Sequence, residues 1–109
     1  MTKRDYLGEF EQIVLLALMR LGVDAYGVTI RREIERRTGR DVTLGSIYPT
    51  LNRLEQKGFV RSYEGDPRPT RGGRSRRHFE LLPHGLAALE RSRAMLASLW
   101  KGYEPEAGQ

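Results

Sequence analysis

Ser46, Asn52 and Arg53 lie within one short stretch and carry side chains that can pair with nucleic acid. An asparagine amide can pair bidentately with adenine, and an arginine guanidinium can do so with guanine. A serine at a helix N-terminus can offer its hydroxyl and its backbone N–H to a phosphate. The stretch therefore suits base edges and phosphates together. The plain alternative is a solvated surface helix, on which the same residue types are common.

The apolar residues of this stretch predict the helix that would position those side chains. They recur at steps of three and four and share one face: Ile47, Leu51 and Leu54. Pro49 has no backbone N–H, so we expect it in the first turn, which places the N-cap at Gly45 or Ser46. Gly58 is expected to end the helix.

Two further helices are expected before this one. Apolar residues from Leu7 to Leu21 surround nearly the whole circumference of a first helix, which we therefore expect to be buried on several sides. Ile30 and Ile34 mark a second helix that ends at Gly39. Because only a short connection separates Gly39 from Ser46, the second and third helices are expected to form a helix-turn-helix.

A glycine-, proline- and arginine-rich segment from Gly65 to Ser75 separates two expected strands, 59–63 and 78–82. The pattern predicts a hairpin with a long loop, directly after the helix that could read DNA. A hairpin in this position is typical of a DNA-binding wing. The expected fold is therefore mainly α with a small β-hairpin, a winged helix-turn-helix with a C-terminal dimerisation helix.

Most of the basic signal lies in this loop. Five arginines and no carboxylate occur between Arg68 and Arg77. Arg71 and Arg74 bracket Gly72 and Gly73, so these arginines can approach a narrow minor groove with no neighbouring side chain in the way. The alternative is a disordered segment that only adds solubility.

Two tyrosines have two interpretations each. Tyr48, next to Pro49, is either a partly buried aromatic residue or a phosphate ligand through its hydroxyl. Tyr26, which precedes Gly27 at the start of the second helix, has the same two interpretations.

Composition excludes several classes of protein. The 109 residues include 19 Lys and Arg against 14 Asp and Glu, a formal net charge of +5 that favours polyanionic partners. There is no cysteine, which excludes disulfides and thiolate chemistry and fits a reducing cytoplasm. The longest apolar run, Ile13 to Met19, is far shorter than the roughly 20 residues that cross a bilayer.

No catalytic or metal-binding constellation is evident. His78 and His84 are the only histidines, and neither has a second histidine or a carboxylate at ligand or catalytic spacing. We therefore expect structural or solvated histidines, no metal, no cofactor and no enzyme.

The last helix is expected to begin at Pro83 and to pair two copies of the chain. A seam at alternating steps of three and four contains Leu89, Ser92, Leu96, Leu99 and Tyr103. Together with the first helix it presents more apolar surface than one chain of this size can cover. We expect residues 1–85 to bind DNA and residues 86–109 to form the dimerisation helix and tail.

The residues expected at the dimer interface are apolar or aromatic: Leu7, Phe10, Val14, Leu89, Leu96, Leu99, Trp100 and Tyr103. Trp100 carries one further hypothesis, a site for a flat apolar or cationic effector between the subunits. The simpler alternative is a tryptophan of the core or of the seam.

The order of these features resembles the PadR family of transcription regulators, over essentially residues 7–100. Four segments carry the resemblance: Ile13–Leu18, Tyr26–Gly27, Gly45–Leu51 with Leu54–Val60, and Arg77–Leu81 through Gly85. The Tyr48-Pro49 pair is the most specific of these marks. The single C-terminal helix is similar to the shorter PadR-like subgroup.

The resemblance implies a homodimer that binds a palindromic operator, usually as a repressor. It makes Tyr48, Asn52 and Arg53 recognition-helix contacts and the arginines around Gly72 wing contacts. The residues that we expect to contact double-stranded DNA combine both elements: Tyr26, Ser46, Tyr48, Pro49, Asn52, Arg53, Lys57, Arg71, Gly72, Gly73, Arg74 and Arg76. The alternatives are a winged-helix module for protein contacts and a nonspecific DNA-binding protein.

Overall fold

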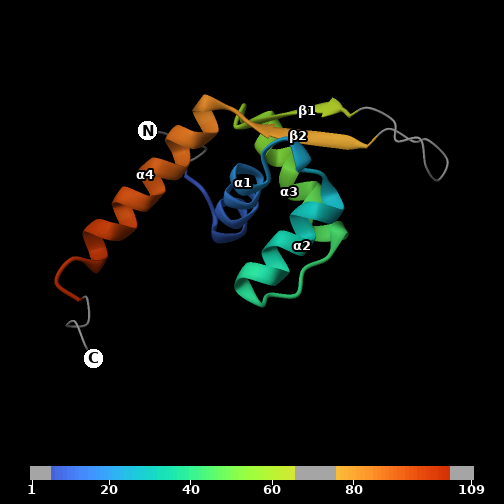
Figure 1. The fold of residues 1–109 in the computed structure, drawn as a ribbon. Helices are drawn as coiled ribbons and strands as arrows, with labels where there is room; N and C mark the ends of the chain where they lie inside the picture. The colour runs from blue at the N-terminus through green and yellow to red at the C-terminus, as the bar shows by residue number, and fades with distance from the viewer. Residues whose placement is uncertain (1–5, 66–75, 104–109) are drawn as a thin grey trace.

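The computed structural model describes residues 6–65 and 76–103 (Figure 1). In chain order its elements are α1 (Glu9–Leu21), the 3-10 turn η2 (Gly22–Asp24), α2 (Gly27–Thr38), α3 (Leu44–Gln56), β1 (Val60–Glu64), β2 (Arg77–Leu81) and α4 (Pro83–Trp100). This order confirms the expected fold, a mainly helical winged helix-turn-helix with one hairpin. Within the described ranges, no helix has both the length and the apolarity needed to span a membrane.

α1 lies at the centre of the core, and α2, α3 and the hairpin pack against it (Figure 1). The largest fully buried side chains come from all of these elements: Val14, Leu15, Ile30, Ile47, Leu51, Leu54, Phe59, Val60 and Phe79. On α3, the spacing of four and three residues between Ile47, Leu51 and Leu54 explains why one face of the helix is buried. α1 is not buried all round, because Leu16 and Met19 are 43% and 48% exposed.

Burial corrects part of the expected dimer interface. Val14 is fully buried and Leu7 is 9% exposed, so both belong to the chain's own core and have little surface to give to a partner. Phe10 is partly buried against the same core, and the Arg40 guanidinium lies 5.4 Å from its ring centroid. The apolar surface that α1 leaves exposed comes instead from Leu16 and Met19.

A short turn joins α2 to α3. α2 ends at Gly39, which adopts the left-handed conformation (φ 71°) that glycine reaches without steric cost. The N-cap of α3 is Thr43 and not Gly45 or Ser46, since the Thr43 hydroxyl accepts the Ser46 N–H at 3.1 Å.

Pro49 consequently lies inside α3 and not in its first turn. A proline removes the N–H that would have bonded to the Gly45 carbonyl, four residues earlier. Because Gly45 and Pro49 are both exposed, water can hydrate that carbonyl, and the helix continues through the proline.

The hairpin is antiparallel, with Val60 opposite Leu81 and Glu64 opposite Arg77. A third segment adds to it. Tyr26 forms an isolated bridge with His78, and the Phe79 N–H donates to the Ala25 carbonyl at 2.9 Å. The base of the hairpin is therefore bonded to the residues that begin α2.

α4 begins with Pro83 at its first position, as expected. A Cβ on Gly85 would collide with the Phe59 carbonyl oxygen and lie 2.8 Å from Leu81 Cδ1, so only glycine permits this close packing. The buried residues of α4 all lie at or before Ser92: Gly85, Ala88, Leu89 and Ser92. Its second half extends away from the body (Figure 1).

This packing bears on two expectations. The boundary between residues 85 and 86 falls inside α4, so the proposed division separates roles and does not mark a break in the fold. Leu89 is only 7% exposed and belongs to the core. In contrast, Leu96, Leu99, Trp100 and Tyr103 are exposed, Leu99 by 74% and Tyr103 by 80%.

Candidate nucleic-acid interface

α3 presents a continuous polar strip to solvent. Ile47, Leu51 and Leu54 are fully buried on its core side. The exposed residues lie on the opposite side and include four that the sequence predicted: Ser46, Pro49, Asn52 and Arg53, with Gln56 completing the strip. A strip of this kind on one side of a helix is what can enter a major groove and meet base edges.

Ser46 does not offer the donors that we expected of it. Its N–H donates to the Thr43 hydroxyl at 3.1 Å, and its own hydroxyl donates to the Thr43 carbonyl at 2.8 Å. Since Thr43 is the N-cap, Ser46 stands at the third helical position, whose N–H usually bonds to the capping side chain. The cap thus engages both donors that the sequence assigned to a phosphate.

Tyr48 packs across the start of α2. A Cβ placed on Gly27 would lie 2.7 Å from Tyr48 Cζ and collide with the phenol oxygen, so the tyrosine fills the space that a side chain at position 27 would need. The Tyr48 residue is 36% exposed. This contact connects the two dipeptides that the sequence singled out and gives Tyr48 a packing role; its expected phosphate contact stays a prediction.

Glu11 of α1 engages the C-terminal end of α3. The Lys57 ammonium donates to its two carboxylate oxygens at 3.1 and 3.3 Å, and Arg53 Nε lies 3.8 Å from Oε2. The Lys57 side chain is only 21% exposed. The expected contact between Lys57 and DNA is therefore not supported, because its ammonium already pairs with a buried carboxylate.

A second carboxylate connects α3 to the wing. Glu55 accepts hydrogen bonds from the Ser62 hydroxyl at 2.8 Å, the Ser62 N–H at 3.2 Å and Arg77 Nη2 at 3.0 Å. The Ser62 hydroxyl is the largest influence on Glu55 and lowers the pKa of its carboxyl, against an opposing effect of burial. The hairpin is thus fixed to α3 as well as to α2.

Aromatic rings fill the base of the wing. His78 lies between Tyr26 and Tyr63, with ring centroids 5.3 and 5.5 Å away, and His78 Nδ1 is 3.0 Å from the Val23 carbonyl oxygen. The Arg76 guanidinium lies 4.8 Å from the Tyr26 ring centroid. Tyr26 is half-buried and packs beneath the exposed Arg76 at the root of the loop; its expected phosphate contact stays a prediction.

The remaining wing residues, Arg71, Gly72, Gly73 and Arg74, lie outside the described residues. In the part of the chain that the structure describes, no three His, Cys, Asp or Glu side chains form a group that could hold a metal ion.

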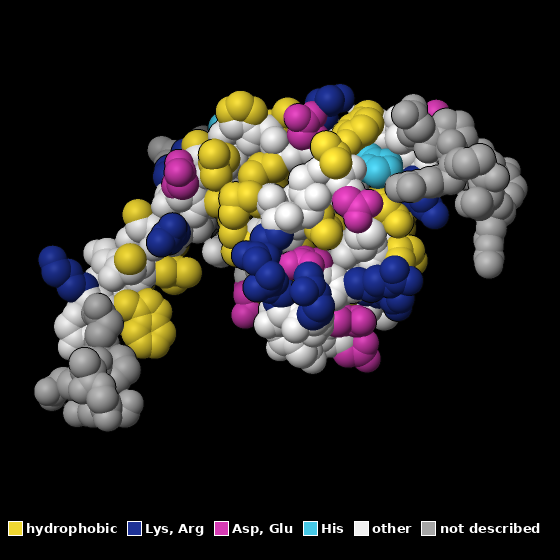
Figure 2. All heavy atoms as spheres, viewed as in Figure 1, with side chains coloured by type: hydrophobic (Ala, Val, Ile, Leu, Met, Phe, Trp, Pro, Cys, Tyr) yellow, Lys and Arg dark blue, Asp and Glu magenta, His cyan; other side chains and the backbone are white. Residues whose placement is uncertain are grey.

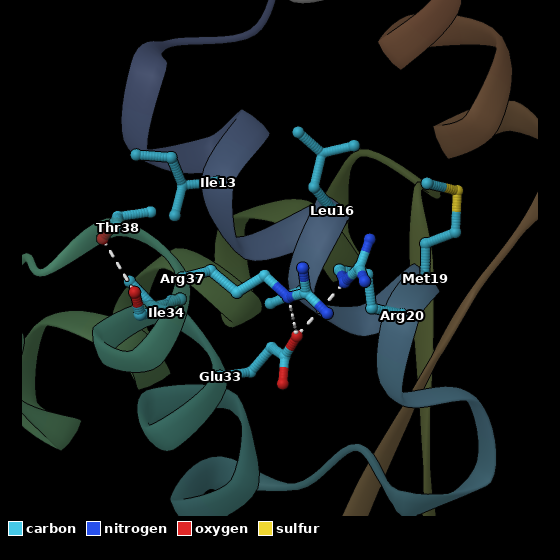
Figure 3. Close-up of a pocket in the computed structure, with 9 residues that line it drawn as sticks. Ile13, Leu16, Met19, Arg20, Glu33, Ile34, Arg37 and Thr38 are labelled. Carbon is cyan, nitrogen blue, oxygen red and sulfur yellow. Dashed lines mark hydrogen bonds and ion pairs between the residues drawn. The ribbon is translucent and has the colours of Figure 1, made fainter.

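A further ionic cluster joins α1 to α2. Figure 3 shows Arg20 and Arg37 directed toward the Glu33 carboxylate, at 3.2 and 2.9 Å, and Arg36 also donates to it. The cluster adjoins a pocket of about 270 Å³ with apolar walls that include Ile13, Leu16 and Met19. Its arginines are about half exposed or more, and Lys and Arg side chains gather over this face in Figure 2.

The sequence analysis missed Glu11, Thr43, Glu55 and the Glu33 cluster. Only the ion pairs of Glu33 with Arg36 and Arg37 could have been predicted from the sequence, because these arginines follow Glu33 by three and four residues, the spacing of ion pairs on a helix. The others join residues far apart in the chain or depend on the exact helix start.

Comparison with known proteins identifies the family. The transcriptional regulator PadR-like family model matches residues 15–91. Transcriptional regulator Rv3488 of Mycobacterium tuberculosis is 36% identical over 76 residues, which cover 70% of this chain and 66%, just under two thirds, of that protein.

Solved structures agree in fold. A complex structure of hsRosR-S1 has a TM-score of 0.72 at 27% identity and covers 93% of this chain and 82% of that one. A PadR family transcription regulator from Clostridium difficile, at 20% identity, has a TM-score of 0.66 and covers 86% of this chain and 97% of its own. The match to the family model and the shared fold agree with the resemblance seen in the sequence: this chain belongs to the PadR-like family of transcriptional regulators.

Proposed function

We propose that the chain is a repressor that binds a palindromic operator as a homodimer, with α3 in the major groove and the arginine-rich wing on phosphates or in the minor groove. The polar strip of α3, next to a hairpin fixed to both α2 and α3, carries this proposal. The net charge of +5 supports a polyanionic partner. Membership of a regulator family makes catalysis a poor alternative.

The proposal assigns different roles to the two elements. Asn52 and Arg53 are exposed on α3 and suited to base edges, whereas the arginines of the wing are suited to phosphates. Specificity should therefore depend on α3, and affinity for any duplex on the wing.

The test begins by enriching a duplex from a random-sequence pool with the wild-type protein. Binding of this duplex and of a shuffled duplex is then measured at several salt concentrations. Asn52→Ala should cost about 1 to 3 kcal/mol on the enriched duplex and much less on the shuffled one. Replacing Arg71 and Arg74 by alanine should weaken both duplexes similarly and lower the salt slope by roughly one to two per subunit.

Three results would contradict the proposal. If the loop variant loses only the enriched duplex while Asn52→Ala weakens both equally, the wing reads the sequence. If the wild-type protein enriches no duplex but still binds random duplex DNA, the chain is a nonspecific DNA-binding protein. If it binds no duplex DNA at all, the chain is a protein-interaction module.

A groove between α1 and α4 supports the homodimer. It has a volume of about 680 Å³ and is lined by Leu16 and Met19 of α1 and by Leu86, Leu96 and Trp100 of α4, all exposed. Figure 2 shows hydrophobic side chains along the far half of α4. A second copy's α4 has the same apolar residues and can fill this groove, as an isologous interface requires.

Trp100 lines the same groove and is 62% exposed. A flat apolar or cationic effector bound between the subunits stays a prediction. Because Trp100 is the only tryptophan, quenching of its fluorescence by planar cationic dyes reports directly on this site.

A further inference from the structure

We propose that Glu11 is a specificity-determining residue, a carboxylate on α1 that withholds Lys57 from DNA and orients Arg53 toward a base. The inference rests on the proposed function, in which α3 reads the operator. Glu11 lies outside α3 and affects DNA binding indirectly, through its ion pairs with Lys57 and Arg53.

The contacts of Glu11 come from two directions. On its own helix, Oε1 accepts the Gly8 N–H at 2.9 Å, which fixes the carboxylate at the start of α1. From α3, it receives the Lys57 ammonium on both oxygens and Arg53 Nε at 3.8 Å. Because the Glu11 side chain is only 11% exposed, water screens these interactions less than it would at the surface.

Arg53 is constrained from two sides. Its Nε faces Glu11, and its Nη2 donates to the Thr50 hydroxyl at 3.1 Å. Its side chain is still 56% exposed, so part of the guanidinium remains accessible to a base edge. Holding a long side chain in one orientation before binding lowers the conformational entropy lost when it meets the base.

The Glu11 carboxylate holds Lys57 in a less exposed position than Arg53. Its ammonium is directed into the α1–α3 junction, away from solvent, and contributes little to phosphate binding there. Without the Glu11 charge, Lys57 could turn outward and Arg53 could bind whichever phosphate is nearest. Affinity for any duplex would then rise while discrimination fell.

The first variant is Glu11→Gln, which removes the charge and keeps an oxygen to accept the Gly8 N–H. Binding to the enriched and shuffled duplexes should show a rise of about 2- to 5-fold on shuffled DNA and a loss of about 3- to 10-fold in preference. The control is Glu9→Gln, which removes the same charge from the same turn of α1. Glu9 is 79% exposed and pairs with Arg40, so this control should raise both affinities equally.

The second variant, Glu11→Gln with Lys57→Met, restores the wild-type net charge. It should abolish the gain on shuffled DNA and still show the loss of preference, because Arg53 remains without its partner. The double variant also removes the partly buried ammonium that Glu11→Gln would leave unpaired, while Arg53 is 56% exposed and can be hydrated. It therefore provides the test if the single variant unfolds in a thermal denaturation control.

Three results are decisive against this role. If Glu11→Gln matches Glu9→Gln within error, or if the double variant recovers the wild-type preference, Glu11 has only a general electrostatic effect. If Glu11→Gln lowers the affinity for both duplexes and the thermal stability of the protein together, the role of Glu11 is purely structural. If the wild-type protein shows no preference for the enriched duplex, the proposed function itself is wrong. The wild-type measurement reveals this without any variant.

Discussion

Gly27 is the residue on which the junction of α2 and α3 depends. Its missing side chain leaves room for the Tyr48 ring, which would otherwise lie 2.7 Å from a Cβ. Gly27→Ala should destabilise the fold by about 1 to 3 kcal/mol, because a rigid ring in a packed site must move to admit a methyl group. Chemical denaturation monitored by circular dichroism measures this free energy of unfolding.

The matched control is Gly45→Ala. Gly45 is also helical, but a Cβ there would meet only Thr43 Oγ1 at 3.7 Å, an ordinary contact. Alanine at this position should be neutral or stabilising by up to about 1 kcal/mol, since it restricts the unfolded chain. Equal destabilisation by both substitutions would show that the cost comes from the loss of glycine and not from Tyr48.

The sequence predicted individual residues well where periodicity alone decides their position. The steps of three and four that bury Ile47 and Leu54 also expose Asn52 and Arg53. It did not predict the intramolecular partners of Ser46 and Lys57, because these are set by the exact N-cap and by a carboxylate 46 residues away from Lys57. Spacing along one helix contains no information about such partners.

At the scale of elements, Glu33 connects α1 to α2. Hydrogen bonds from Arg36 and then Arg37 lower the pKa of its carboxyl from the ordinary value of 4.5. A folded-state pKa below the unfolded one contributes stability above about pH 4.5, and this contribution is lost as the pH falls through the folded-state value. Glu33→Gln should therefore be less stable than the wild type at pH 7, with a smaller difference at pH 3.

Denaturation midpoints at pH 7, 5 and 3 measure this effect. Glu35→Gln is the control, because it neutralises a carboxylate of the same helix that forms no ion pair among the described residues. Some acid sensitivity should persist in Glu33→Gln, since the lowered pKa of Glu55 acts in the same direction. A constant difference between Glu33→Gln and the wild type across this range would contradict the assignment.

Most element boundaries followed from local signals. Gly39 ends α2 and Pro83 begins α4 where the sequence placed them, because both residues have strong backbone preferences. Pro49 misled the prediction for α3, since an exposed proline can be accommodated inside a helix. The bridge between Tyr26 and His78 had no signal, because a single strand pair formed by so short a segment leaves no periodicity.

At the scale of the whole molecule, residues 93–100 of α4 are exposed and pack against no other element among the described residues. Leu99→Glu should convert the proposed dimer to a monomer, because a carboxylate in an apolar interface loses its hydration without gaining a cation. Since Leu99 is 74% exposed, the substitution should leave the fold of the single chain intact. Sedimentation velocity at micromolar concentration measures the mass.

Val23→Glu is the matched control. Val23 is 85% exposed and lies in η2, whereas Leu99 lies on α4 beside the exposed Leu96 and Trp100. This variant should remain dimeric. A wild-type monomer, or a Leu99→Glu protein that still sediments as a dimer, would contradict the proposed interface.

The hydrogen bond from the Phe79 N–H to the Ala25 carbonyl fixes the base of the wing relative to the helix-turn-helix. In the proposed function, the spacing between α3 and the wing is therefore set before DNA arrives. If α3 binds DNA as proposed, the contact that the wing makes becomes intramolecular, and its strength depends on the effective concentration of the wing near the adjacent groove. The avidity of this proposed two-part interface should then depend on how rigidly the Ala25–Phe79 bond and the Glu55 contacts hold the hairpin, as well as on the number of arginines beyond it.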